Sequence, residues 1–138
     1  MAHVLLFMAD MLESLFASSN YQAANVMMDV SAIRHQALAG NLANVETPGY
    51  RRVDIDPSFK AALSESVKAG EVTEIQRFGT PEVAEVRGLK AVRSDGNNVS
   101  LDRELMYINQ NALEYQAMGQ FVSSSLNRLK MAITGQAQ

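Results

Sequence analysis

The stretch from Leu101 to Ile133, LDRELMYINQNALEYQAMGQFVSSSLNRLKMAI, decides the fold of this 138-residue chain. Its apolar and small residues recur at alternating steps of four and three, which is the a/d spacing of a coiled coil. We call the positions that carry this pattern the assembly seam: Leu101, Leu105, Ile108, Ala112, Tyr115, Gly119, Val122, Leu126, Leu129 and Ile133. A helix of this length is roughly 50 Å long. It should project beyond one small core, so the seam is expected to need partner helices.

A second long helix is predicted over residues 19–46, because an apolar stripe there also steps by four and three. Its members are Val26, Val30, Ile33 and Ala37. Pro48 should end the helix, since the residue before a proline is pushed out of the helical region. A shorter amphipathic helix is predicted over residues 3–16, on the spacing of Val4, Met8, Met11 and Leu15.

The chain therefore divides into three segments: an N-terminal helical segment (1–46), a middle segment (47–99) and a C-terminal coiled-coil helix (100–138). In the middle, Asp56-Pro57 is typical of a helix start and Gly70 of a helix end. Short strands or loops are expected over EVTEIQRF at residues 71–78 and over residues 82–92, and a turn at 95–98. The predicted fold class is mainly α, with long N- and C-terminal helices forming a coiled-coil-like pair around a small irregular or short-β middle.

The amino-acid composition narrows the range of functions that this chain can have. A net charge of −3 argues against binding to nucleic acid or anionic membranes, which need basic surfaces. The absence of cysteine excludes disulfides and thiol catalysis and leaves the compartment open. The apolar run at the start ends at Asp10 and has no basic leader, so no cleaved signal peptide is expected. Residues 1–10 look additional, with Met8 and Met11 as alternative start positions.

The search for reactive groups finds little. Neither His3 nor His35 has a second histidine three or four residues away, so metal ligation is not expected. Asp54 and Asp56 lack the spaced acids and glycine of a calcium loop. No nucleophile-elbow, Walker or dinucleotide-binding pattern occurs. We expect no enzyme, no cofactor, no metal and no small-molecule substrate.

The distinctive local motif is NLANVETPGY at residues 41–50, which we call the signature turn. Its marked positions are Asn41, Ala43, Asn44, Thr47, Pro48, Gly49 and Tyr50. Physically it is a helix exit: Asn44 tolerates a left-handed conformation or bonds to nearby backbone, and Gly49 allows a reversal. Asn41 and Asn44 share one helix face, from which their amides could bridge to a neighbouring helix.

This run resembles the N-x-A-N-x-x-T-P-x-Y signature of flagellar axial proteins, the rod, hook and hook-associated subunits. Within that family the short proximal rod subunits are the most similar. Their features match TPGYRRVDID at 47–56, DGNNVSLDREL at 95–105 and NALEYQA at 111–117. Pro57 departs from the pattern, since an aromatic residue usually stands there.

The resemblance implies a structural subunit of the bacterial flagellar proximal rod, assembled helically with copies of itself and other rod subunits into a hollow drive shaft. It also implies contacts with a membrane-ring adaptor and the flagellar export gate, and type III export to the periplasmic basal body. The unequal helix pair agrees independently, because an unfilled seam suits a heterologous interface and an open array. The alternatives are another short rod component, which should lack the DGNNV turn, and a coiled-coil adaptor or export chaperone that does not polymerise.

Overall fold

The computed structural model describes residues 19–70 and 79–134. Its elements are α2 (Ser19–Ala43), β1 (Val53–Ile55), α3 (Pro57–Ala69), β2 (Val83–Glu85) and α5 (Leu101–Thr134). Two long helices and a small antiparallel sheet between them in sequence confirm the predicted fold class. The short helix predicted over residues 3–16 lies outside the described residues, as do the strands or loops expected over residues 71–78 and the last positions of the segment predicted over 100–138.

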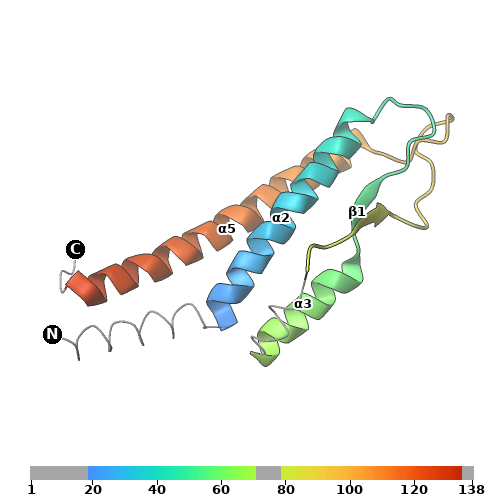
Figure 1. Ribbon diagram of the computed structural model, residues 1–138. Helices are drawn as coiled ribbons and strands as arrows, with labels where there is room; N and C mark the ends of the chain where they lie inside the picture. Colours follow the sequence, from blue (N-terminus) through green and yellow to red (C-terminus); the bar gives the residue numbers. More distant parts are fainter. Residues whose placement is uncertain (1–18, 71–78, 135–138) are drawn as a thin grey trace.

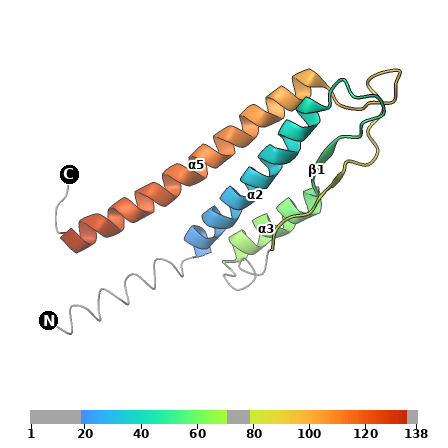
Figure 2. The same cartoon turned by 45° about the horizontal axis from the view of Figure 1, so that its top comes forward.

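The two long helices lie side by side and run in opposite directions (Figures 1 and 2). Asn41 contacts Glu104, and ten residues earlier Ser31 contacts Asn111, so one index rises as the other falls. The helices are unequal, with 25 residues in α2 and 34 in α5. The C-terminal end of α5 consequently extends past the first turn of α2 (Figure 1).

Helix α2 ends at Ala43 and not at residue 46, where the sequence pattern put its end. The cause is Asn44, whose side-chain amide donates to the carbonyl of Gly40 at 2.9 Å. Residues 44–49 then follow as turns. Asparagine competes in this way with helical backbone bonding and so favours helix ends.

Helix α3 confirms the predicted start and end. The Asp56 carboxylate accepts a bond from the backbone N–H of Ser58 at 2.7 Å, and Pro57 occupies the first turn, where its missing N–H costs nothing. Gly70 ends the helix with φ of 69°, a left-handed conformation that glycine adopts without a steric penalty.

The sheet pairs β1 with β2 in antiparallel register, with Val53 opposite Glu85 and Ile55 opposite Val83. Strand β2 falls in residues 82–92, one of the two stretches expected to hold short strands or loops. Strand β1 was not predicted. Its three residues carry no alternation long enough to indicate a strand, and their partner lies about thirty residues away in sequence.

The apolar core lies where α2, β1 and α3 meet. Ala23, Val30, Ile55 and Leu63 form a buried cluster, and four partly buried residues pack against it: Val26, Ile33, Phe59 and Val67. Within residues 19–70 and 79–134, buried polar residues are as numerous as buried apolar ones. The packing between the two chain ends therefore depends on polar groups as much as on apolar ones.

Candidate functional site

One side chain from the far end of the middle segment fixes the signature turn through hydrogen bonds. Asn97, fully buried, donates from its amide nitrogen to the carbonyls of Asn44, Val45 and Thr47 at 3.0, 3.1 and 2.9 Å. Its amide oxygen accepts from the backbone N–H of Val99 at 2.7 Å. One asparagine thus satisfies carbonyls that the end of α2 and the following turn leave without helical partners.

The next residue continues the same contact. Asn98 accepts a bond from the backbone N–H of Arg52 at 2.7 Å, and its own N–H donates to the carbonyl of Tyr50 at 3.4 Å. Asp95 in turn accepts from the N–H of Asn97 at 3.0 Å. The predicted turn at residues 95–98 is therefore also the clamp on residues 44–52, a role that its turn-forming composition alone does not indicate.

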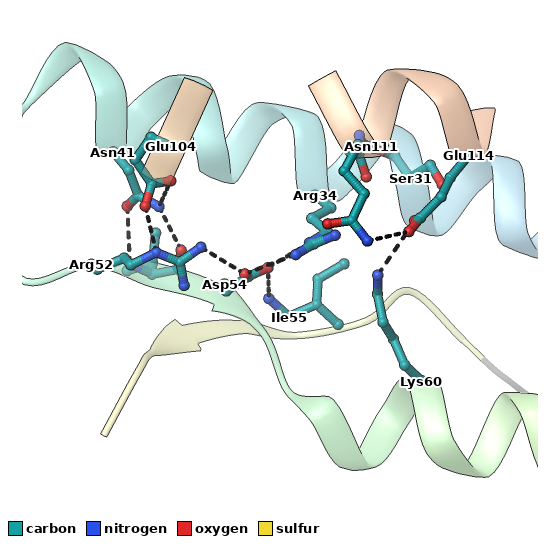
Figure 3. Close-up of polar contacts among 12 residues, drawn as sticks. Ser31, Arg34, Asn41, Arg52, Asp54, Ile55, Lys60, Glu104, Asn111 and Glu114 are labelled. Carbon is teal, nitrogen blue, oxygen red and sulfur yellow. Dashed lines mark hydrogen bonds and ion pairs between the residues drawn. The ribbon is translucent and has the colours of Figure 1, made fainter. Parts of the chain in front are cut away.

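Asn41 joins three elements at one point, as Figure 3 shows. Its amide nitrogen donates to the carbonyl of Val53 at 2.7 Å and to the Glu104 carboxylate at 3.2 Å. Its amide oxygen accepts from the N–H of Val53 at 2.9 Å and from the Tyr50 hydroxyl at 3.3 Å. The expected bridge from Asn41 to a neighbouring helix is present, and that helix is α5 of the same chain. Among the described residues Asn44 makes no such bridge, because its side chain bonds to Gly40 and Thr47 nearby in sequence.

Glu104 is the buried charge of this site, with no exposed surface. Arg52 donates to it from Nε at 2.5 Å and to Asp54 from a terminal guanidinium nitrogen at 2.9 Å. Arg34 donates to the other side of the Asp54 carboxylate at 3.0 Å (Figure 3). We call Asn41, Arg52, Asp54, Glu104 and Arg34 the polar clasp. A buried carboxylate is tolerated only when paired and hydrogen-bonded, and Glu104 is both.

An aromatic ring completes the clasp. The Tyr107 ring lies 4.9 Å from the Arg52 guanidinium carbon and 5.8 Å from that of Arg34, both within cation–π range. Tyr107 is one turn beyond Glu104 on α5. The same stretch of α5 therefore offers Arg52 both a negative charge and a π face.

The pKa shifts follow from these contacts. For Asp54, burial alone would raise the pKa, but hydrogen bonds from Arg34 and Arg52 outweigh it and lower the pKa below the usual 3.8. For Arg52, burial lowers the pKa, yet the bonds to Glu104 and Asp54 raise it overall. Burial, together with the nearby Glu104 charge, raises the pKa of Tyr50. At neutral pH Asp54 and Arg52 are thus both charged, and the Tyr50 hydroxyl keeps its proton.

The remaining signature residues lie around the turn. The Thr47 hydroxyl donates to the Asn44 amide oxygen at 3.1 Å, and Gly49 has φ of 71°, the reversal that its position predicted. Ala43, Pro48 and Gly49 are exposed. Sequence reasoning marked Asn41 and Tyr50 but missed Asn97, Arg52 and Glu104, because nothing local to those three residues reveals their partners.

The assembly seam lies beside the face of α5 that packs on α2, not at its centre. Leu101, Leu105, Tyr115, Leu126 and Ile133 are exposed, and the other five seam residues are partly buried. Among the side chains of α5 that the structure describes, the buried ones are Glu104, Asn111 and Ser125, spaced at multiples of seven residues and each one residue away from a seam position. Contact between the chain ends therefore uses a partly polar stripe and leaves the apolar seam half covered.

The site contains groups that bind chain segments to one another. In the described part of the chain no cluster of three or more potential metal ligands occurs. Nor does any helix over residues 19–70 and 79–134 have the length and apolarity to cross a membrane. Fold and site together define a helix-paired protein whose two ends are joined through an asparagine-rich turn.

Comparison with known proteins identifies the family. No family model matches the chain. It is 36% identical over 110 residues to the flagellar basal body rod protein FlgB of Aquifex aeolicus (strain VF5), covering 76% of this chain and 85% of that protein. It is 33% identical over 121 residues to FlgB of Escherichia coli (strain K12), covering 77% and 85%. Against FlgB of Bacillus subtilis (strain 168) the identity is 26% over 129 residues, covering 88% and 98%. The chain belongs to the FlgB family of flagellar basal body rod proteins, which confirms the resemblance seen at residues 41–56 and 95–105.

Proposed function

We propose that this protein is a structural subunit of the flagellar proximal rod, which assembles helically with copies of itself and other axial proteins into a hollow drive shaft. Its role is mechanical and involves no catalysis, cofactor or small-molecule substrate. Its neighbours in this proposal are other rod subunits, with a membrane-ring adaptor and the export gate below them. Export takes place through the flagellar type III apparatus without a cleaved signal peptide.

The observation that carries the proposal is the half-covered assembly seam on a helix that is longer than its partner. Leu101, Leu105, Leu126 and Ile133 are each 39–48% exposed on α5, although they continue a coiled-coil spacing. Apolar side chains in such a row gain about 25 cal/mol per Å² when they leave water. A seam of this kind favours association with helices of other subunits, and a heterologous contact that does not close produces an open helical array.

The polar clasp supports the same role. It fixes the two chain ends against each other through hydrogen bonds and ion pairs whose geometry permits only one register. A subunit that transmits torque needs its long helices held at a constant offset, so that every copy presents the same seam to its neighbours. The signature turn is in this proposal the rigid end of the subunit.

The test uses Leu126→Asp in cells that lack the native gene. Leu126 is exposed in the single chain, so the charge should leave the fold intact while entering the seam contact. The matched control is Asn127→Asp, the exposed neighbour that lies off the seam. We expect Leu126→Asp chains to be missing from purified basal bodies and the cells to be non-motile, whereas Asn127→Asp chains assemble.

Circular dichroism of both purified variants checks that the helices are retained. Basal bodies that form complete rods without this chain would contradict the proposed function. A chain found bound to a single soluble partner and absent from basal bodies would favour the adaptor instead. Equal incorporation of both variants would show that the seam is not part of the assembly interface.

A further inference from the structure

A groove lies between α2 and α5, beside the assembly seam. Its volume is about 390 Å³, and its lining includes Ala32 and Gln36 from α2 with Asn111, Ala112 and Tyr115 from α5. Ala112 and Tyr115 are themselves seam positions, so the groove is continuous with the seam. Small side chains on both helices leave room for an incoming side chain.

Asn111, which lines the groove, has a buried hydrogen-bond acceptor that is not paired within the described part of the chain. The side chain is 2% exposed, and its amide nitrogen donates to the carbonyl of Ser31 at 2.8 Å. Its amide oxygen has no hydrogen-bond partner among residues 19–70 and 79–134. A buried acceptor left unpaired costs free energy. A single water, with a share of about 30 Å³ in the liquid, would pair with the oxygen but would not fill the groove.

A second surface of the same helix offers what the groove requires. Met106, Leu113 and Gln120 follow one another at seven-residue intervals and are all exposed; we call them, with Asn109, the outer face of α5. Leu113 is 67% exposed, more than any other large apolar side chain in the described residues. Asn109, four residues before it and also exposed, carries an amide donor one helical turn away.

We propose that the groove of one copy receives the outer face of α5 from a second copy of this chain. Leu113 of the incoming copy packs against Ala32 and Ala112, and the Asn109 amide of that copy donates to the Asn111 oxygen. The inference rests on the proposed function and specifies which surfaces successive copies use. Groove and outer face are different surfaces of one molecule, so the contact is heterologous and each docked copy presents a fresh groove.

The chain has no cysteine, which allows a clean cross-linking test. One tagged copy carries Ala32→Cys and another carries Leu113→Cys, both expressed in cells without the native gene. Oxidation of purified basal bodies should join the two copies, because a disulfide needs Cβ atoms about 3.5–4.5 Å apart. The matched control replaces Ala32→Cys with Glu65→Cys, an exposed position on α3, and should give no cross-link. A chain with both Ala32→Cys and Leu113→Cys should give a ladder of oligomers.

The outcomes separate this inference from the proposed function. If Ala32→Cys and Leu113→Cys chains are both present in basal bodies but form no adduct with each other, the docking mode is overturned and the rod assignment stands. Adducts only between two Ala32→Cys copies would also overturn it, because they indicate a two-fold contact. Absence of the chain from basal bodies would overturn both proposals together.

A second variant tests the packing without cysteines. Leu113→Ser should lower incorporation into basal bodies, because the lost apolar burial weakens docking by about tenfold or more. Val92→Ser is the matched control: Val92 is 58% exposed and lies outside α5, so its loss should have no effect. Equal incorporation of the two variants would contradict the role of Leu113.

Discussion

The two halves of α5 are joined to their surroundings by different chemistry. In the first half, Glu104, Tyr107 and Asn111 contact groups on α2 or the segment around β1 through charges, a π face and a hydrogen bond. From residue 121 onward, the side-chain hydrogen bonds of the described residues stay within α5, as from Ser125 to the Phe121 carbonyl. The first half is fixed by directional contacts to other elements, and both halves expose apolar side chains, such as Leu113 in the first and Leu126 in the second.

The directional contacts of the first half hold α5 at one position against α2 and the segment around β1. Directional bonds specify a single register, because a shift of one residue would separate Asn41 from Val53 and Glu104. Apolar contacts are non-directional and accept neighbours in more than one geometry. We infer that the polar clasp defines the subunit and that the apolar side chains exposed along α5, Leu113 and Leu126 among them, serve its association.

The largest loss of stability is expected from Glu104→Ala, which removes the buried charge of the polar clasp. Arg52 would then keep Asp54 as its one carboxylate partner in the clasp, and Asn41 would lose its link to α5. Removing one partner of a buried pair costs about 3–5 kcal/mol, so the urea midpoint of the purified chain should fall steeply. The control is Glu114→Ala, whose ion pair with Lys60 is 3.7 Å long and 39% exposed on each side. That variant should lose less than about 1 kcal/mol. Equal losses would mean that the clasp is no more stabilising than a surface pair.

The clamp on the signature turn should be the next most sensitive point. Asn97→Ala removes the donor to three carbonyls and the acceptor for Val99, so we expect a loss of about 2–3 kcal/mol. Asn127→Ala, at an exposed position on α5, is the control and should be nearly neutral. Hydrogen exchange should report faster opening of residues 44–52 in Asn97→Ala. Unchanged hydrogen exchange over residues 44–52 would show that the signature turn is stable without the Asn97 side chain.

Lowering the pH should weaken the polar clasp before it affects the apolar packing. The pKa of Asp54 is lowered in the folded chain, so its carboxylate stabilises folding above the unfolded value of 3.8, and that contribution is lost as pH falls through the lower folded pKa. Unfolding free energy should therefore drop as the pH falls below the unfolded pKa of 3.8. Asp54→Asn should be less stable at neutral pH and should show a shallower drop. Glu65→Gln, on α3, provides the control for an exposed carboxylate. A drop of the same size in Asp54→Asn would exclude this carboxylate as the cause.

Local signals in the sequence were sufficient for the helices and the caps. The four-three spacing predicted α2 and α5, and Asp56, Pro57 and Gly70 predicted both ends of α3, because each signal acts within a few residues. Strand β1 could not be found in this way, since three residues become a strand only when Val83–Glu85 pairs with them. Its existence depends on the rest of the fold.

The site was predictable only in part, for the same reason. The signature indicated that Asn41 would reach a neighbouring helix, but an acidic residue in the first turn of a helix, as Glu104 is in α5, is favoured by the helix dipole alone. Its burial depends on Arg52, fifty-two positions earlier in the chain. Apolar spacing likewise predicted the seam but not the stripe of α5 that contains Asn111 and packs on α2. A search for periodic apolar residues cannot find an interface in which half of the residues are polar.

The smallest expected effects concern two glycines that flank the clasp, and they should have opposite signs. Gly49 has φ of 71° with no atom within 4 Å of an added Cβ, so Gly49→Ala should cost only the backbone strain, about 1–2 kcal/mol. Gly40 lies inside α2, also with no atom within 4 Å, so Gly40→Ala should raise stability by about 0.5–1 kcal/mol through helix propensity. Urea unfolding of the two variants measures both. A loss in Gly40→Ala would show that the end of α2 is less regularly helical than its contacts indicate, which would weaken the view of the signature turn as the rigid end of the subunit.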